Sequence, residues 1–482
     1  MIGLLSHPRG PAAPAGLLQV IRTCWQRPFR SRARRLGAAL GLLAVAGVLL
    51  VGCQQSSTAA RPRRAVWVDV ALGRASGSDT VTPERLRAPA DPGPGLPVRR
   101  VAVTLDPATP PPPVAASATE VIVIAPRFGA DAELAAEVAR LADVLPGWVE
   151  ATRGASSPAR ILLVLRGPAF DAESRPADAW TAQLPKLSAA AFAAAVEPVY
   201  VFSGEEHAAA SVAEVISQPV DREYDLELKL LANGIRRTPK SFYGFRQLGF
   251  HLPESGREVT IVRPYRTAPG HPLVWRGEFF GHQPQVDLAL LNHGYHVVYV
   301  KAQNLYGAPV AMRFWGEALD AFRHMELTGK IVLIGMSRGG LYCYNWAALH
   351  PETVAAIYGD APVCDFKSWP GRRGRSTGPA GLWPELMAAY GFESDSQALA
   401  YPNPVDNLAP LAAAGIPIIH VLGTADTAAI PEENSDLVEA RYRALGGTIQ
   451  VIRKPGVDHH PHSLADPTPI VDFILQHARP SR

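Results

Sequence analysis

Residues 330–340 read KIVLIGMSRGG, and this stretch decides the fold. Within it, residues 331–334 are apolar and mostly β-branched, which is typical of a strand buried on both faces of a sheet. Residues 341–349 are largely apolar and precede Pro351, so they are predicted to form a helix that ends before the proline. Residues 335–339 must therefore make a tight turn. This order of strand, turn and helix predicts one unit of an α/β sheet.

The tight turn has the pattern G-x-S-x-G, with Ser337 at its centre. Between a strand and a helix, this pattern is typical of a nucleophile elbow. We expect any Cβ atom at Gly335 or Gly339 to press on the neighbouring strand and helix. The turn would lift the serine hydroxyl onto the helix N-terminus, where the N–H of Arg338 can stabilise an oxyanion. The alternative, a chance turn rich in glycine and serine, is disfavoured by the strand and helix around it.

From about residue 235 onward, apolar strand patterns alternate with helical patterns. Such alternation predicts an α/β fold with a doubly wound, mostly parallel sheet, whose chemistry lies at the carboxyl ends of the strands. The predicted strands are 258–262, 297–300, 331–334, 354–358, 416–422 and 449–452, and the predicted helices are 286–292, 312–325, 341–349, 433–445 and 470–477.

A serine nucleophile needs a histidine base, and the histidine needs a carboxylate that orients it. Asp426 follows the predicted strand 416–422, and His459 lies in the loop after the last strand. The chain order of serine, acid and histidine is the order found in α/β-hydrolases. Asp360 is a rival acid because it also follows a predicted strand, and its alternative role is to cap that strand's end.

Three histidines compete for the role of base. His459 is favoured because Gly456 precedes it by three residues, whereas His460 and His462 would orient the loop or line the pocket. A metal site is the alternative for this loop, but histidine ligands usually occur with carboxylates at wider spacing. We therefore predict no metal and no organic cofactor.

The second oxyanion donor is expected in the loop after an early strand. Residues 264–280 occupy that place, and Trp275 or Arg276 would offer its backbone N–H. The guanidinium groups of Arg276 and Arg338 would then be free to bind a carboxylate on the substrate, such as a uronate. The alternative is that both arginines brace their loops through acids such as Glu278.

An insertion between Asp360 and residue 416 is rich in aromatic residues, among them Trp369 and Trp383. These tryptophans are candidate substrate-binding residues because aromatic rings stack on sugars. The alternative is that they pack the interior of a lid.

The N-terminal part of the sequence predicts a targeting signal and a separate domain. An apolar run at residues 36–52 follows several arginines and ends in LVGC, so residues 1–53 are predicted to be a lipoprotein signal peptide with lipidation at Cys53. A plain membrane anchor is the alternative. Residues 54–118 are rich in Pro and Ala and are predicted to be a linker, although residues 65–72 and 101–105 have the pattern of edge strands. Residues 119–234 are predicted to form a small α/β domain, followed by a catalytic domain at 235–482.

Composition excludes one class of partner. The net charge is +3, and no basic stripe carries interleaved aromatic residues, so nucleic acid is not an expected ligand. After processing at Cys53, two cysteines would remain, Cys343 and Cys364. A disulfide between them and two buried free thiols are equally compatible with the sequence.

Four stretches together carry a family resemblance. They are WRGEFFGH at 275–282, GMSRGG at 335–340, DAPVCDFKSWPG at 360–371 and HHPHSL at 459–464. The chain from residue 235 resembles serine hydrolases of the α/β-hydrolase fold, and more narrowly the secreted hydrolases of polysaccharide-degrading bacteria. The resemblance implies esterase activity on small or polymeric carbohydrate esters. The predicted lipidation at Cys53 would hold such an enzyme at the bacterial cell envelope.

Two other functions remain open. One is a peptidase of the prolyl-oligopeptidase type, which has the same triad and fold, although residues 119–234 are too short for the propeller of such enzymes and lack its repeats. The other is a non-enzymatic binding protein on a hydrolase scaffold, which a missing triad residue would indicate. Candidates for all three triad positions are present, so hydrolysis is the preferred prediction.

Overall fold

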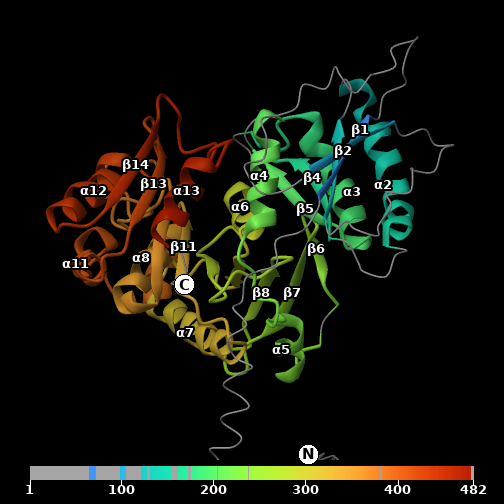
Figure 1. Ribbon diagram of the computed structural model, residues 1–482. Helices are drawn as coiled ribbons and strands as arrows, with labels where there is room; N and C mark the ends of the chain where they lie inside the picture. The colour runs from blue at the N-terminus through green and yellow to red at the C-terminus, as the bar shows by residue number, and fades with distance from the viewer. Residues whose placement is uncertain are drawn as a thin grey trace, which may run out of the picture. The chain divides into compact units, whose positions relative to one another are not determined.

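The computed structural model describes residues 65–71, 98–104, 121–127, 131–153, 160–171, 175–202, 205–236, 238–379 and 381–478, which all belong to one compact unit (Figure 1). The predicted signal peptide, Cys53 and most of the predicted linker lie outside these residues. Within the described ranges, no helix combines the length and the apolar character needed to cross a bilayer.

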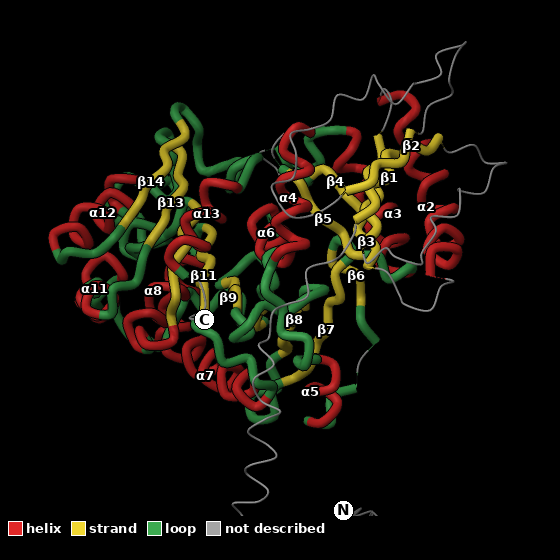
Figure 2. The backbone as a smooth tube through the Cα atoms, viewed as in Figure 1, coloured by secondary structure: helices red, strands yellow, loops and turns green. Residues whose placement is uncertain are grey.

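The larger sheet has nine strands in the order β14-β13-β12-β11-β9-β10-β8-β7-β6 (Figure 2). The strands from β9 to β14 are parallel, whereas β6, β7 and β8 join the sheet as antiparallel neighbours. The predicted mostly parallel sheet is thus confirmed. The strand bounds are β6 Lys240–Phe242, β7 Phe245–His251, β8 Glu258–Arg263, β9 Leu273–Arg276, β10 His296–Val300, β11 Ile331–Met336, β12 Val354–Asp360, β13 Ile418–Gly423 and β14 Ile449–Lys454.

Helices cover both faces of this sheet because consecutive strand residues point to opposite sides. On β9, Val274 packs with helices α6 and α13, whereas Leu273 and Trp275 pack with α7, α8, α11 and α12. The sheet is therefore wound on both faces, as predicted. The helix bounds are α6 Gln285–Asn292, α7 Pro309–His324, α8 Gly339–Leu349, α9 Leu382–Tyr390, α10 Asp395–Ala400, α11 Ala409–Ala413, α12 Ser435–Ala444 and α13 Thr468–His477.

A second, smaller sheet has five parallel strands in the order β2-β1-β3-β4-β5. Helices α2 and α3 cover one of its faces and α4 packs on the other. Strand β1, from the predicted linker, lies inside the sheet between β2 and β3, so of the two predicted edge strands only β2 lies at an edge. The bounds are β1 Ala65–Ala71, β2 Val98–Thr104, β3 Val121–Arg127, α2 Asp131–Arg153, β4 Arg160–Arg166, α3 Ala179–Ala193, β5 Glu197–Val201, α4 Glu205–Ser217 and α5 Leu226–Ala232.

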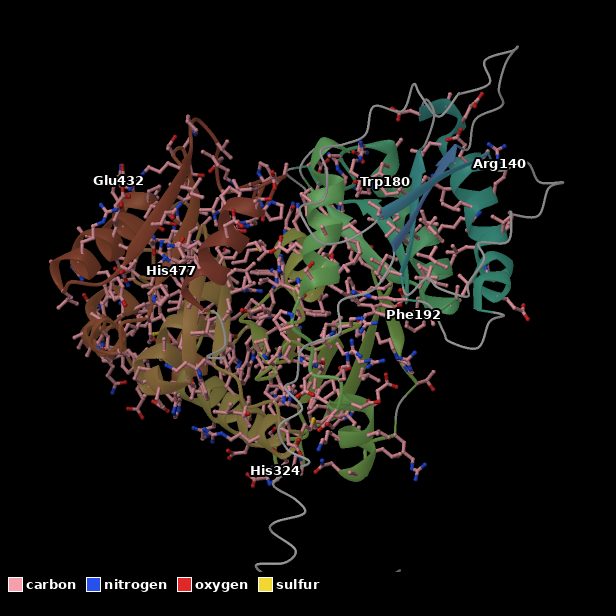
Figure 3. All side chains as sticks on the ribbon, in the orientation of Figure 1. Arg140, Trp180, Phe192, His324, Glu432 and His477 are labelled. Atoms are coloured by element: carbon pink, nitrogen blue, oxygen red, sulfur yellow. The ribbon has the colours of Figure 1, made fainter. Side chains whose placement is uncertain are left out.

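The two sheets share buried contacts. The amide of Asn292 on α6 accepts a hydrogen bond from the N–H of Tyr200 at 2.9 Å and donates one to the carbonyl of Pro198 at 2.8 Å, so it bridges to β5. Side chains fill the space between the sheets and their helices (Figure 3). Trp180 on α3, for example, is 4% exposed, and its indole N–H donates to the Arg166 carbonyl.

Candidate active site

Ser337 stands at the carboxyl end of β11 in a strained turn, with a φ angle of +48°. Its N–H donates to the Asp360 carbonyl at 2.8 Å, which ties the turn to the end of β12. A Cβ atom added to Gly335 would lie 2.9 Å from the Cα of Gly340, and one added to Gly340 would lie 2.6 Å from the Val363 carbonyl oxygen. The turn therefore needs glycine at both positions.

The structure brings Ser337, His459 and Asp426 together in one chain of hydrogen bonds. The Ser337 Oγ lies 2.9 Å from His459 Nε2, and His459 Nδ1 lies 2.7 Å from Asp426 Oδ2. Both residues are buried, since the serine is 8% exposed and the aspartate 4%. These distances suit proton transfer from the serine to the imidazole and orientation of the imidazole by the carboxylate.

The second oxygen of Asp426 is held by the backbone. Its Oδ1 accepts hydrogen bonds from the N–H groups of Ala428 and Ala429, both at 2.8 Å. These bonds fix the orientation of the carboxylate. With Oδ1 occupied in this way, Oδ2 is the oxygen that accepts from the imidazole.

The acid loop and the base loop pass very close to each other. A Cβ atom at Gly423 would lie 2.2 Å from the Val457 carbonyl oxygen, so only glycine allows the base loop to cross there. The Asp458 carboxylate accepts hydrogen bonds from the N–H groups of Thr427 and His459 at 2.8 and 2.7 Å. Asp458 thus holds both loops in register, and the sequence analysis did not single it out.

Of the three histidines in the base loop, His459 is the one hydrogen bonded to Ser337. His460 is exposed, whereas His462 is buried with its Nδ1 3.4 Å from Asp360 Oδ1. Asp360 therefore lies in a second pair and does not contact His459. Burial would raise the pKa of Asp360, but His462 and Lys454 outweigh burial and lower it.

A metal site was the alternative for this loop. The nitrogen atoms of its three imidazoles that could bind a metal ion lie within 4.8 Å of one another, so the loop could hold one. A fourth histidine, His282, stacks edge-on against His462 with ring centres 5.9 Å apart. Burial, followed by the charge of His462, lowers the pKa of His282 to about 4. His282 is therefore neutral at physiological pH and adds no charge beside the base.

The prediction that Trp275 or Arg276 supplies the second oxyanion donor is wrong. The N–H of Gly277 donates to the Ile334 carbonyl on β11, and donors alternate between the two neighbours along a central strand. The N–H of Arg276 therefore points to β10 and that of Trp275 to β11, so both are used within the sheet.

The next residues along the chain offer the donor instead. Within the described part of the chain, the N–H groups of Glu278, Phe279 and Arg338 have no hydrogen-bond acceptor. A Cβ atom placed on Gly339 would lie 3.3 Å from the Glu278 nitrogen, so the loop after β9 lies against the elbow. Free N–H groups on these two loops are therefore the candidates for the oxyanion hole.

The two arginines that were candidates for binding a substrate carboxylate both pair with acids of the protein. Arg276 is 1% exposed, and its guanidinium lies 2.8 Å from the Asp287 carboxylate. Arg338 lies 3.6 Å from the buried Glu278 carboxylate and also over the ring of Phe279, 5.0 Å from its centre. Both arginines therefore brace the loops around the elbow.

A cavity of about 330 Å³ opens beside the elbow. Its lining combines two acids and two cations with aromatic and polar groups, namely Glu258, Thr260, Glu278, Phe279, Phe280, Tyr299, Lys301, Gln303 and Arg338. This volume suits a small substrate or one unit of a larger one.

The aromatic insertion packs against itself. Trp369 is 8% exposed and belongs to a cluster with Phe366 and Leu386, and the Trp383 indole N–H donates to Asp395 at 3.0 Å. These contacts match the alternative in which the aromatic residues pack the interior of a lid. Cys343 on α8 and Cys364 in the insertion are buried free thiols and are not bridged.

No family model and no curated protein sequence matches this chain. Many solved structures resemble this chain, and three examples match about half of it. They are a puromycin-hydrolyzing peptidase of Mycobacterium tuberculosis (13% identity, 51% of this chain, 42% of that chain, TM-score 0.39), an acylaminoacyl peptidase of Pyrococcus horikoshii (12%, 52%, 44%, 0.38) and dipeptidyl peptidase 4 of Porphyromonas gingivalis (14%, 48%, 36%, 0.35).

The chain spans less than half the length of these three structures. The fold itself follows from the topology described above. A mostly parallel sheet is covered by helices on both faces, a serine elbow follows β11, and a carboxylate and a histidine follow β13 and β14. This order of elements is that of the α/β-hydrolases. The larger sheet and its helices have the α/β-hydrolase fold.

Proposed function

We propose that this protein is a serine hydrolase that cleaves a carboxylic acyl bond through an acyl-enzyme. The observation that carries the proposal is the unbroken hydrogen-bonded chain from Ser337 through His459 to Asp426. A serine beside a base that is oriented by a buried acid is the arrangement that nucleophilic acyl transfer requires.

In the first half of the reaction, the Ser337 Oγ attacks the carbonyl carbon while its proton passes to His459 Nε2. Asp426 stabilises the imidazolium that forms. The tetrahedral oxyanion accepts hydrogen bonds from the N–H of Arg338 and from the N–H of Glu278 or Phe279. When the intermediate collapses, His459 Nε2 returns the proton to the leaving oxygen or nitrogen, and the acyl group stays on Ser337.

In the second half of the reaction, water replaces the leaving group. His459 Nε2 accepts a proton from the water while the water oxygen attacks the acyl carbon. The same N–H groups stabilise the second oxyanion, and the proton then returns to Ser337 as the acid departs. These steps need only the side chains and backbone groups of this chain.

The substrate is either an ester or a peptide. The sequence resemblance described above implies a carbohydrate ester. The three solved structures named above are described as peptidases, so a peptide is the second candidate substrate. Both substrates give the same acyl-enzyme chemistry, so one set of assays distinguishes them.

The test compares kcat/KM on p-nitrophenyl acetate, an acetylated oligosaccharide, a methyl uronate ester and dipeptide p-nitroanilides. Ser337→Ala is expected to lose all turnover on whichever substrate the wild type cleaves. Ser396→Ala is the matched control, because Ser396 is exposed on α10. If the wild type and Ser337→Ala hydrolyse every substrate equally, the proposal is wrong.

We also propose that the protein is anchored by lipid at Cys53 on the outer face of a bacterial membrane. The basic and apolar residues before this cysteine support the proposal. Growth with a clickable palmitate analogue is expected to label the wild type, while Cys53→Ser should remain unlabelled. Equal labelling of both proteins would exclude anchoring at this residue.

A further inference from the structure

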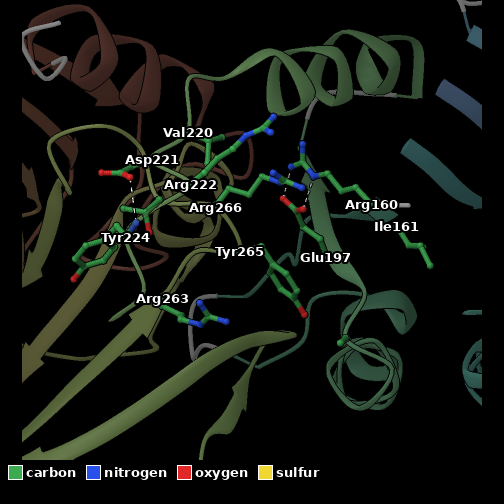
Figure 4. Close-up of a pocket in the computed structure, with 12 residues that line it drawn as sticks. Arg160, Ile161, Glu197, Val220, Asp221, Arg222, Tyr224, Arg263, Tyr265 and Arg266 are labelled. Carbon is green, nitrogen blue, oxygen red and sulfur yellow. Dashed lines mark hydrogen bonds and ion pairs between the residues drawn. The ribbon is translucent and has the colours of Figure 1, made fainter. Parts of the chain in front are cut away.

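A second cavity, of about 380 Å³, lies where the two sheets meet (Figure 4). Arg160 and Glu197 from the small sheet form one side, and Arg263 and Arg266 from the end of β8 and the loop after it form the other. Because β8 is antiparallel to β10, its carboxyl end lies at the start of the parallel strands. The cavity is therefore at the sheet edge opposite to Ser337, and the proposed acyl transfer does not use it.

The lining of this cavity is basic. It contains four arginines and two acids, so the charged groups that face it sum to +2 at neutral pH. The arginines are Arg160, Arg222, Arg263 and Arg266, and the acids are Glu197 and Asp221. Like charges placed around a partly enclosed space repel one another unless an anion lies between them.

Two of the arginines already pair with acids of the protein. Arg160 forms a two-point pair with Glu197, at 2.6 and 2.7 Å. The Nε of Arg263 lies 2.9 Å from the carboxylate of Glu227, which is outside the cavity lining and which Arg263 shares with Arg246 at 2.6 Å. The remaining lining acid, Asp221, is turned toward His271, with 2.8 Å between its Oδ2 and the imidazole Nε2.

The other two arginines have no such partner. Among the described residues, no carboxylate lies within ion-pair distance of Arg222 or Arg266. Arg222 is exposed at the mouth, whereas Arg266 is half-buried between the two sheets. Burial, followed by the positive charge of Arg160, lowers the pKa of Arg266, and Glu197 opposes this shift only in part. An unpaired guanidinium in such a place lacks the anion that usually accompanies it.

We propose that this cavity binds a dianion of the phosphate or sulfate type, held by the free guanidinium groups of Arg266 and Arg222. Guanidinium is the preferred protein partner of such groups, because its planar N–H fork matches two oxygens at once. A doubly charged ligand balances the +2 of the lining. The volume exceeds that of a single inorganic ion, so the anionic group of a small organic molecule fits as well as a free one.

The test measures binding by isothermal titration of the whole protein at fixed ionic strength. The probes are inorganic phosphate, inorganic sulfate, glucose 6-phosphate and, as a monovalent control, acetate. We expect saturable binding of one phosphate or sulfate group per chain and at least tenfold weaker binding of acetate. Tighter binding of glucose 6-phosphate than of inorganic phosphate would identify the ligand as an organic phosphate, and equal binding would identify it as the free anion.

Three variants locate the site. Arg266→Gln and Arg222→Gln are each expected to weaken phosphate binding about tenfold or more, because each loses charge-assisted hydrogen bonds. Arg313→Gln, an exposed position on α7, is the control with the same change in net charge and should bind like the wild type. Ester or peptide hydrolysis should be equal in all four proteins. Absence of saturable binding to the wild type, or equal weakening in Arg313→Gln, would overturn the proposal.

Discussion

The Asp458 carboxylate accepts a hydrogen bond from the backbone N–H of Thr427 at 2.8 Å, which joins the loop of the base to the loop of the acid. The same carboxylate accepts a second bond from the N–H of His459 at 2.7 Å. The distance from Asp426 to His459 therefore depends on a residue that takes no part in proton transfer. Partial burial would raise the pKa of Asp458, but the N–H groups of Thr427 and His459 outweigh it and lower the pKa.

Asp458→Asn is expected to reduce kcat several-fold while leaving the Ser337 hydroxyl in place. A carboxyl group whose pKa is lowered in the folded state stabilises the protein above its unfolded pKa, and this contribution is lost as the pH falls through the lowered value. The thermal midpoint of the wild type should therefore fall more steeply in acid than that of Asp458→Asn. Asp472→Asn, on the exposed face of α13, is the control. Parallel pH profiles for the wild type and Asp458→Asn would contradict this role.

Alanine substitutions of the three histidines in the base loop should have different effects on kcat and on stability. His459→Ala is expected to lower kcat about as much as Ser337→Ala, roughly 10³-fold or more, because nucleophile and base act as one unit. His460→Ala should have little effect, since His460 is exposed. His462→Ala should mainly reduce stability, because it leaves the buried Asp360 without its partner. Steady-state kinetics and urea unfolding of the three variants decide the matter, and a larger loss of kcat in His460→Ala than in His459→Ala would assign the base differently.

Substitution of Gly277 tests how closely the loop after β9 approaches the elbow. A Cβ atom at this position would lie 2.7 Å from the Gly339 carbonyl oxygen, which is backbone and cannot rotate away. Gly277→Ala should therefore separate the two loops, lower kcat at least tenfold and cost about 1–3 kcal/mol of stability.

Gly316 on α7 is the matched control, since a Cβ atom there has no neighbour within 4 Å. Gly316→Ala should keep full activity and raise the free energy of unfolding by about 0.5–1 kcal/mol, because alanine favours a helix interior. Kinetics and urea unfolding of both variants provide the comparison. If Gly277→Ala is as active as Gly316→Ala, the two loops are not in the contact described here.

The ion pair of Arg338 and Glu278 predicts how the thermal stability of an Arg338 variant depends on pH. Burial raises the pKa of Glu278, although Arg338 opposes this shift. Arg338→Gln should raise the pKa further, because the buried carboxylate loses its cation. A carboxyl group with a raised folded-state pKa costs stability as the pH rises through its unfolded pKa toward the folded value. The thermal midpoint of Arg338→Gln should therefore be well below that of the wild type at pH 8 and closer to it at pH 5. An equal difference at both pH values would show that Glu278 does not depend on Arg338.

Much of the larger sheet could be predicted because its strands are short apolar runs with helical patterns between them. The elbow was predictable as well, since glycine spacing and flanking elements are local features of the sequence. Strand β9 was missed because its four residues, LVWR, end in a charge and follow a long loop. Without β9, the sequence pattern places Trp275 and Arg276 in a loop, and it therefore predicts the wrong oxyanion residues.

Other features depend on tertiary contacts that no local pattern reveals. Helix α3 begins at Ala179, where the Asp178 side chain caps it, and it continues through Pro185, a residue that usually ends a helix. The pairing of Arg276 with Asp287 joins the end of β9 to helix α6, and neither residue has a sequence signal for the other. The basic cavity assembles residues from four separate segments, which only the packing of the two sheets brings together.

The most direct test of the central claim is covalent labelling of the nucleophile. The wild type, Ser337→Ala and His459→Ala are incubated with a fluorophosphonate probe, and the labelled peptide is identified by mass spectrometry. We expect one label per wild-type chain, on Ser337, none on Ser337→Ala, and strongly slowed labelling of His459→Ala because the base that activates the serine is missing. A label on another serine, or undiminished labelling of Ser337→Ala, would contradict the assignment of Ser337 as the nucleophile.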